Sequence, residues 1–228
     1  MNPGRYSMIV TDGHSHIIKE FTIASEDEEI IDKMGNVMTN YGRTLVRFSG
    51  ETYEYVLPEN VEQVLNDAFR GSKIIKFIYD REREWDISVN DRFPLEGCEI
   101  EQLEIKDGIS VIPDYLFAKT SIENLTIPKS VERIGVKSFY ACSELEEIVV
   151  EDNNRLTLID TYAFGGVIEG ANASSKIKSV TFGTSEDGYS CDIGMGAFFL
   201  CDSLKKVILH DGFNLRSIGN VAFAKRND

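Results

Sequence analysis

The sequence predicts an α/β repeat solenoid: a right-handed coil with a ladder of parallel strands and short helical turns, preceded by an N-terminal α/β cap. The first observation is that seven of the 13 phenylalanines recur at intervals of 24, 24, 22, 25, 34 and 25 residues. A period in the low twenties is typical of repeat proteins, whose units are too small to bury a core alone and stack on their neighbours. These residues are Phe69, Phe93, Phe117, Phe139, Phe164, Phe198 and Phe223.

The second observation is a short apolar triplet that precedes six of these phenylalanines. In each triplet the first and third side chains would point inward and the middle one outward, as in a half-buried strand. Stacked about 4.8 Å apart, such strands form a parallel sheet, and the helical turns would cover one of its faces. The triplets are Phe77–Tyr79, Leu103–Ile105, Leu125–Ile127, Ile148–Val150, Val180–Phe182 and Val207–Leu209.

The segment between strand and phenylalanine completes the unit, most clearly in Leu125–Ile148. A turn marked by Pro or Asp-Gly follows the strand, then a Val-x-x-Ile-Gly step, and then a short helical turn with Ala-Phe or Ser-Phe. The small residue would allow close packing, and the phenylalanine would fill the space between coils. Because Cys142 and Cys201 both stand three residues after such a phenylalanine, we expect them to be buried structural thiols.

The full unit, Ile-Pro-x-x-Val-x-x-Ile-Gly-x-x-Ser/Ala-Phe-x-x-Cys-x-x-Leu-x-x-Ile, resembles the BspA-type leucine-rich repeat family. The resemblance covers roughly Tyr53–Phe223. Two units depart from it, since no small residue precedes Phe93 and Pro113 replaces the glycine before Phe117. The resemblance implies a curved solenoid that binds proteins or surfaces, and many members of this family are secreted or attached to the cell surface.

Residues 1–50 do not fit the repeat and are predicted to form a capping subdomain, with the solenoid spanning 51–228. A solenoid needs a cap because its first coil is otherwise uncovered. The opposite end stops soon after Phe223 without a closing strand, which predicts a monomer or weak self-association through an uncapped C-terminal end. The cap is predicted to contain strands at Tyr6–Val10 and His16–Ile23, a helix that starts at Ser25–Glu28 and ends near Met38, and a hairpin of Thr44–Phe48 with Thr52–Val56.

The net negative charge of the chain limits which classes of molecule we expect it to bind. The formal net charge is −14, and the stretch Glu96–Glu169 alone carries 15 acidic and 6 basic residues. Such a surface repels nucleic acid and anionic lipid, so we expect no direct nucleic-acid or membrane partner and favour a protein partner, for which a basic surface would be complementary. The chain shows no secretory signal. It is therefore predicted to be cytoplasmic as written, or to act at the cell surface or outside the cell if it is a trimmed part of a longer protein.

Catalytic motifs are incomplete, so we predict a protein that is not an enzyme and has no catalytic residues, no metal site and no cofactor. Neither a phosphate-binding loop nor a nucleophile elbow occurs. The His14-x-His16 pair resembles the metal motif of amidohydrolases, but that chemistry needs further ligands from later strands. Only His210 remains, far along the chain, so a polar loop is the favoured interpretation.

Function is therefore expected to lie in protein–protein interaction through the strand face, meaning the outward side chains of the stacked strands, or through the inserted segments Gly165–Lys176 and Gly183–Ser190. An alternative is an acidic inhibitor or decoy that occupies a basic, nucleic-acid-binding surface of another protein. The candidate contact residues on the strand face are Lys76, Ile78, Glu104, Lys106, Thr126, Glu147, Val149, Glu151, Thr181, Lys206, Ile208 and His210.

Overall fold

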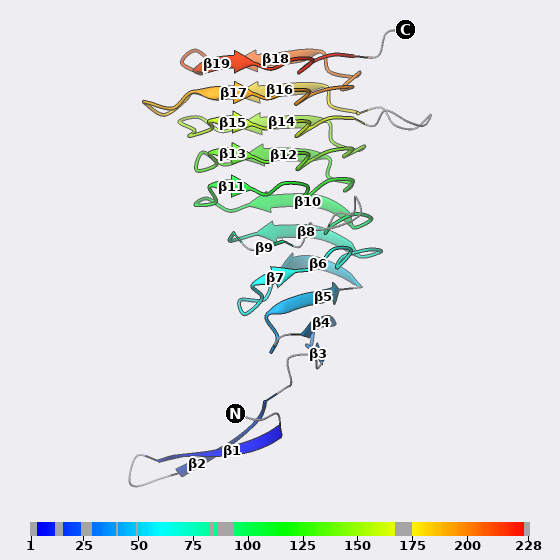
Figure 1. The fold of residues 1–228 in the computed structure, drawn as a ribbon, viewed down its shortest axis with the longest axis vertical. Helices are drawn as coiled ribbons and strands as arrows, with labels where there is room; N and C mark the ends of the chain where they lie inside the picture. The colour runs from blue at the N-terminus through cyan, green and yellow to red at the C-terminus, as the bar shows by residue number, and fades with distance from the viewer. Residues whose placement is uncertain are drawn as a thin grey trace.

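The computed structural model shows consecutive coils stacked along one axis (Figure 1). Each coil places a long strand on one side, a short strand on a second side and a tight turn on the third. Strands pair in parallel from coil to coil, which confirms the predicted solenoid. The structure describes residues 4–11, 16–23, 29–39, 41–48, 50–82, 84–85, 94–166 and 175–225.

The predicted triplets all lie in the ladder of long parallel strands. In register, Leu125, Ile148 and Val180 lie above one another and are buried, so each strand turns its inward side chains to a continuous core. One sheet contains β6 (Glu51–Val56), β8 (Lys73–Tyr79) and β10 (Glu99–Ile105), and the next contains β12 (Asn124–Ile127), β14 (Glu147–Val150), β16 (Ser179–Phe182) and β18 (Lys206–Leu209). Strand β10 lies beside β12 in the stack (Figure 1).

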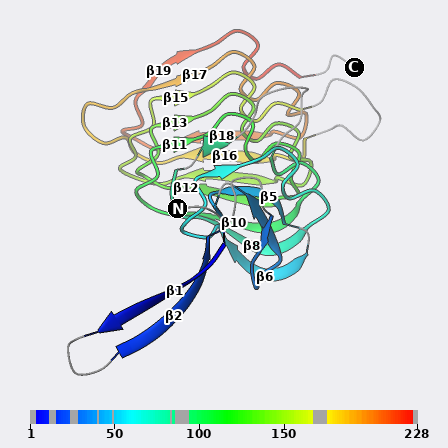
Figure 2. The same ribbon diagram turned by 60° about the horizontal axis from the view of Figure 1, so that its bottom comes forward.

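The Ile-Gly step forms a second ladder of short strands on another side of the coils (Figure 2). Its buried isoleucines, such as Ile134, face the core. Glycine follows Ile134 because a Cβ at Gly135 would lie 2.4 Å from Oδ1 of Asp114 in the preceding coil. The ladder contains β11 (Val111–Ile112), β13 (Arg133–Ile134), β15 (Leu158–Ile159), β17 (Cys191–Ile193) and β19 (Leu215–Ile218), and β7 (Gln63–Val64) pairs with β9 (Glu84–Trp85) in the same manner nearer the N-terminus.

The third side is not helical, which corrects the predicted short helical turns. The described residues contain no helix, and so none that could cross a bilayer. Backbone N–H groups alternate here: that of Phe139 donates to the carbonyl of Ala163 in the next coil at 2.8 Å, whereas that of Tyr140 closes a turn on Lys137 at 3.1 Å. A helix directs every N–H back along its own chain. Positive φ angles at Lys137 (50°) and Ala141 (59°) set this alternation.

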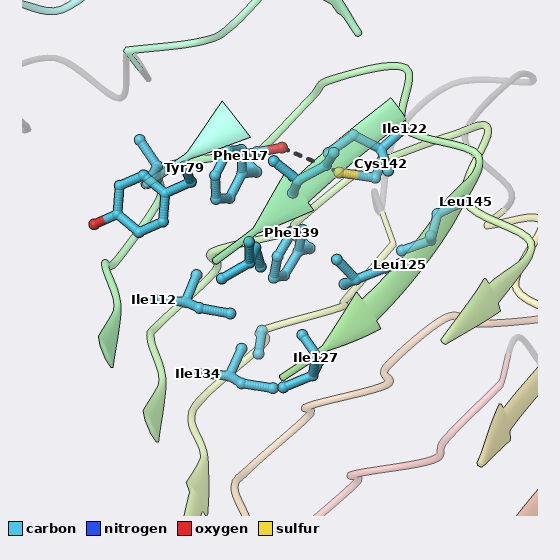
Figure 3. Packing of buried hydrophobic residues seen from close by; sticks show 14 of the residues in the cluster. Tyr79, Ile112, Phe117, Ile122, Leu125, Ile127, Ile134, Phe139, Cys142 and Leu145 are labelled. Carbon is cyan, nitrogen blue, oxygen red and sulfur yellow. Dashed lines mark hydrogen bonds between the residues drawn. The ribbon is translucent and has the colours of Figure 1, made fainter. Parts of the chain in front are cut away.

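The repeating phenylalanines form a stack of rings through the core. Phe117 and Phe139 are buried, and Figure 3 shows Phe139 among apolar side chains of several strands. Phe93 lies outside the described residues. The ring centroids of Phe117–Phe139, Phe139–Phe164, Phe164–Phe198 and Phe198–Phe223 are 5.3, 5.2, 5.1 and 5.1 Å apart, with planes within 11° of parallel.

The repeated cysteines are buried thiols, as predicted. Sγ of Cys142 donates to the carbonyl oxygen of Phe117 at 3.1 Å (Figure 3), and Sγ of Cys201 donates to that of Phe164 at 3.3 Å. Burial raises the pKa of Cys142 to about 11 and that of Cys201 to about 12. All four cysteines are free. Each repeated thiol therefore joins one coil to the preceding one.

The predicted helix that ends near Met38 is wrong. That stretch contains β3 (Ile30–Ile31) and β4 (Asn36–Thr39), an antiparallel pair, while Ser25–Glu28 lies outside the described residues. Oδ1 of Asp32 accepts the backbone N–H of Met34 at 2.8 Å and of Asn36 at 3.0 Å, and Gly35 has a φ of 82°. An Asp-to-Gly turn therefore interrupts the apolar pattern that resembled a helix.

The other predictions for the N-terminal segment have mixed outcomes. Strands β1 (Gly4–Thr11) and β2 (His16–Ile23) pair antiparallel, which confirms the two predicted strands. In Figures 1 and 2 this pair lies away from the stacked coils. The predicted hairpin is wrong: β5 (Thr44–Phe48) pairs with β4 and β7, whereas β6 pairs with β8. The two strands occupy different sides of one coil. The boundary at residue 50 stays a prediction, and the cap contains only strands among its described residues.

The last described coil is open on one side. Among the described residues β18 pairs only with β16 and β19 only with β17, and the inward side chains of Val207 and Leu209 are 42% and 43% exposed. Phe223 is likewise only partly buried. The weak self-association expected at this end stays a prediction.

Replacing Phe139 with alanine should lower the free energy of unfolding by about 3–5 kcal/mol, because it leaves a cavity between two coils. Phe223→Ala, at the half-buried end of the ring stack, should lower the free energy of unfolding by clearly less. Chemical denaturation measures both. Equal losses for the two variants would contradict the role of Phe139 as a filler between coils.

Replacing Ser138 with alanine should leave stability unchanged or raise the free energy of unfolding by about 1 kcal/mol. Its buried Oγ has no hydrogen-bond partner among the described residues, and a buried unsatisfied hydroxyl is costly. The reciprocal change, Ala163→Ser, introduces a hydroxyl at the equivalent buried position and should be destabilising. Denaturation curves that show Ser138→Ala to be destabilising would contradict this reading of the hydroxyl.

Candidate functional site

The strand face divides into two parts with different chemistry. Toward the N-terminus its charges are paired across strands: Nζ of Lys76 lies 2.5 Å from Glu104 and 3.9 Å from Glu54, and Glu104 also contacts Lys106. These contacts raise the pKa of Lys76 and lower that of Glu104. The prediction that Ile78 is an exposed contact residue is wrong, because its side chain is only 7% exposed and belongs to the buried part of the coil.

Toward the C-terminus an uncharged row crosses four strands. Thr126, Val149, Thr181 and Ile208 are paired in register, so their side chains lie side by side on the outward face. All four are half-buried or exposed, and Ile208 is 42% exposed. The structure thus brings together four of the predicted contact residues in a stripe of aliphatic and hydroxyl groups.

Charged side chains border this row on both sides of β16. Glu147 lies on β14, two residues before Val149, and Glu151 lies just past the end of β14, two residues after Val149; both are exposed. Among the described residues neither carboxylate forms an ion pair with a side chain; Glu147 accepts a long hydrogen bond from Ser179 at 3.5 Å, and Glu151 accepts the backbone N–H of Lys129 at 3.1 Å. On β18 the corresponding exposed positions are Lys206 and, just past the strand, His210.

A groove of about 470 Å³ lies where the strand face meets the following turns. Gly183 is part of its lining, and glycine is needed there because a Cβ would lie 2.5 Å from the carbonyl oxygen of Glu151. Asp152 is held at one side: its Oδ1 accepts the N–H of Thr184 at 2.9 Å and lies 3.4 Å from Nδ1 of His210, and these contacts lower its pKa. The groove is lined by Lys129, Val149, Val150, Glu151, Asp152, Thr181, Gly183 and His210.

Two groove residues were not predicted as contact residues: Lys129 and Asp152. Both follow a strand triplet, as does Gly183, which begins the predicted interaction segment Gly183–Ser190. Their common position directly after the triplets was the available signal, because the ends of stacked parallel strands meet at one edge of the ladder. The sequence gives no sign that a Cβ at Gly183 would clash with the neighbouring coil.

The inserted segment Gly183–Ser190 packs against the preceding coil. Asn154 pairs with Ser185 in an isolated parallel bridge, and its buried Nδ2 donates to Thr184 O at 2.8 Å. Arg155 forms a bidentate contact with Glu186 at 2.7 and 3.3 Å. The described part of this insertion therefore extends the coil. Of Gly165–Lys176, residues 167–174 lie outside the described residues.

The described part of the chain contains no group of three or more His, Cys, Asp or Glu side chains placed to hold a metal ion. Burial also raises the pKa of Cys98 and Cys191 to about 12, so these thiols are poor nucleophiles. His14 lies outside the described residues and the side chain of His16 is not described, so the metal hypothesis is untested. The described strand face offers non-covalent contacts.

Comparisons with known proteins agree with the repeat pattern. The family model described as the BspA type leucine rich repeat region, in six copies, matches residues 90–185 and 171–227. No curated protein matches. A leucine-rich repeat protein from Bacteroides ovatus, known from a crystal structure, is 14% identical, with a match that covers 89% of this chain and 79% of that chain and a TM-score of 0.26. Because the family model spans more than half of the sequence, the chain belongs to the BspA-type leucine-rich repeat family.

Proposed function

We propose that this protein is a non-enzymatic interaction module that binds a protein partner on the strand face formed by β12, β14, β16 and β18. The observation that carries the proposal is the uncharged row of Thr126, Val149, Thr181 and Ile208, which is continuous over four strands and bordered by charged residues. An apolar centre with a polar rim is the usual composition of a protein interface.

The rigidity of the ladder supports this choice of surface. The four strands are held by backbone pairing in register and by the buried residues beneath them, so the outward side chains keep fixed spacings before a partner arrives. A preorganised surface loses less conformational entropy on binding. Membership of a leucine-rich repeat family suggests an interaction role in general. The groove at Gly183 adds a concave feature at one edge.

The alternative, an acidic decoy for a basic surface, receives less support from the positions of the carboxylates. Several acidic side chains of the Glu96–Glu169 stretch are already paired within the protein. Arg133, for example, bridges Asp114 at 2.7 Å and Asp160 at 2.8 Å. Fewer carboxylates are then available for a decoy than the net charge implies. Strong salt dependence of partner binding would favour the decoy.

Val149→Arg should reduce capture of the native partner by roughly tenfold or more, because it places a charged, bulky side chain within the uncharged row. The matched control is Val111→Arg, a half-buried valine on β11 in the other ladder. Tagged protein is returned to the cells that produce it, and captured proteins are quantified by mass spectrometry for wild type and both variants. A partner that is captured equally by all three, or no specific capture, would overturn the proposal.

A further inference from the structure

Strand β16 carries only small residues on its outward side. Ser179 and Thr181 are half-buried on the strand, and Gly183 continues their row into the groove. Larger residues stand on both neighbouring strands at the same register, so the outward surface over β16 lies lower than its two sides. The flanking residues are Glu147, Val149 and Glu151 on the side of β14, and Lys206, Ile208 and His210 on the side of β18.

The two sides carry opposite charge around a shared apolar centre. Glu147 and Glu151 supply carboxylates on one side, and Lys206 supplies an ammonium on the other, where the exposed His210 adds an imidazole ring. Val149 and Ile208 face each other across Thr181 in register. At the groove end Lys129 and Asp152 add one further charge of each sign.

The spacing of these side chains matches that of an extended peptide. Along β14 the outward residues recur about 6.6–6.8 Å apart, which is also the distance between alternate side chains of any extended segment. The two flanking strands are separated by two strand spacings, about 9.6 Å, with β16 between them. A segment that lies flat along β16 therefore points odd-numbered side chains to one side and even-numbered ones to the other.

We propose that the partner of this protein contributes an extended segment that lies along β16 and alternates in charge. Its side chains toward β14 are basic, aliphatic and basic, complementary to Glu147, Val149 and Glu151. Its side chains toward β18 are acidic, aliphatic and acidic, complementary to Lys206, Ile208 and His210. The inference rests on the proposed function and specifies the chemistry of the partner at the same site.

The test uses a fluorescein-labelled peptide, Gly-Lys-Asp-Val-Val-Lys-Asp-Gly, and fluorescence anisotropy with the complete chain. The control peptide, Gly-Lys-Lys-Val-Val-Asp-Asp-Gly, has the same composition in a block order that cannot serve both sides. We expect the alternating peptide to bind roughly five- to tenfold more tightly at ~50 mM salt, with the difference reduced at ~300 mM salt. Equal affinity for the two peptides, or no binding of either, would overturn the proposal.

Variants of the protein locate the binding. Glu147→Gln combined with Glu151→Gln should weaken the binding of the alternating peptide by roughly five- to tenfold, because two exposed ion pairs between protein and peptide are lost. The matched control is Glu99→Gln with Glu101→Gln, which removes two exposed carboxylates from β10. Circular dichroism checks that both variants remain folded. Equal loss of binding in both variants would show general electrostatic attraction and overturn the proposal.

A charge-exchange experiment tests direct contact. The double variant Glu147→Lys with Glu151→Lys should no longer bind the alternating peptide. It should instead bind Gly-Glu-Asp-Val-Val-Glu-Asp-Gly, in which both lysines of that peptide are replaced by glutamate. If this exchange fails while Val149→Arg still abolishes capture of the native partner, the strand face remains the binding surface and only the alternating segment is refuted. If Val149→Arg leaves capture unchanged, the proposed function itself fails.

Discussion

The alternation of backbone N–H groups on the turn side is the constraint on which the rest of this structure depends. One N–H closes a turn within its coil, and the next reaches a carbonyl of the following coil, as Tyr140 and Phe139 do. This pattern places each phenylalanine at the same height in its coil, so that the rings stack about 5 Å apart, matching the spacing of parallel strands. The strand ladder, and the candidate site on its outward face, inherit that spacing.

Much of this architecture could be predicted from the sequence, because it depends on side chains that must be buried. The triplet Leu125–Ile127 shows the period of a half-buried strand, and Phe139 is a large apolar side chain that recurs once in each coil and is buried. The Ile-Gly step also left a sequence signal, although its strand character was missed. Gly135 is required there by the close approach of Asp114, which is a contact between residues distant in sequence.

The wrong predictions lie where the backbone conformation depends on features that residue type and apolar spacing do not indicate. Lys137 adopts a positive φ, which is uncommon for lysine and which its residue type does not predict, so the turn was predicted to be helical. Asp32 and Gly35 form a turn inside a stretch whose apolar spacing resembled a helix. On the candidate site, the row of outward residues followed from the strand period. The burial of Ile78 and the groove at Gly183 depend on neighbouring coils, which local sequence does not specify.

The buried thiols of Cys142 and Cys201 link neighbouring coils in their protonated form. Each satisfies a carbonyl of the preceding coil through a hydrogen bond, and both remain protonated because burial raises their pKa. Protonated, shielded sulfur reacts slowly with oxidants and with other thiols. The contacts that these two thiols make between coils therefore require neither a thiolate nor a disulfide bond.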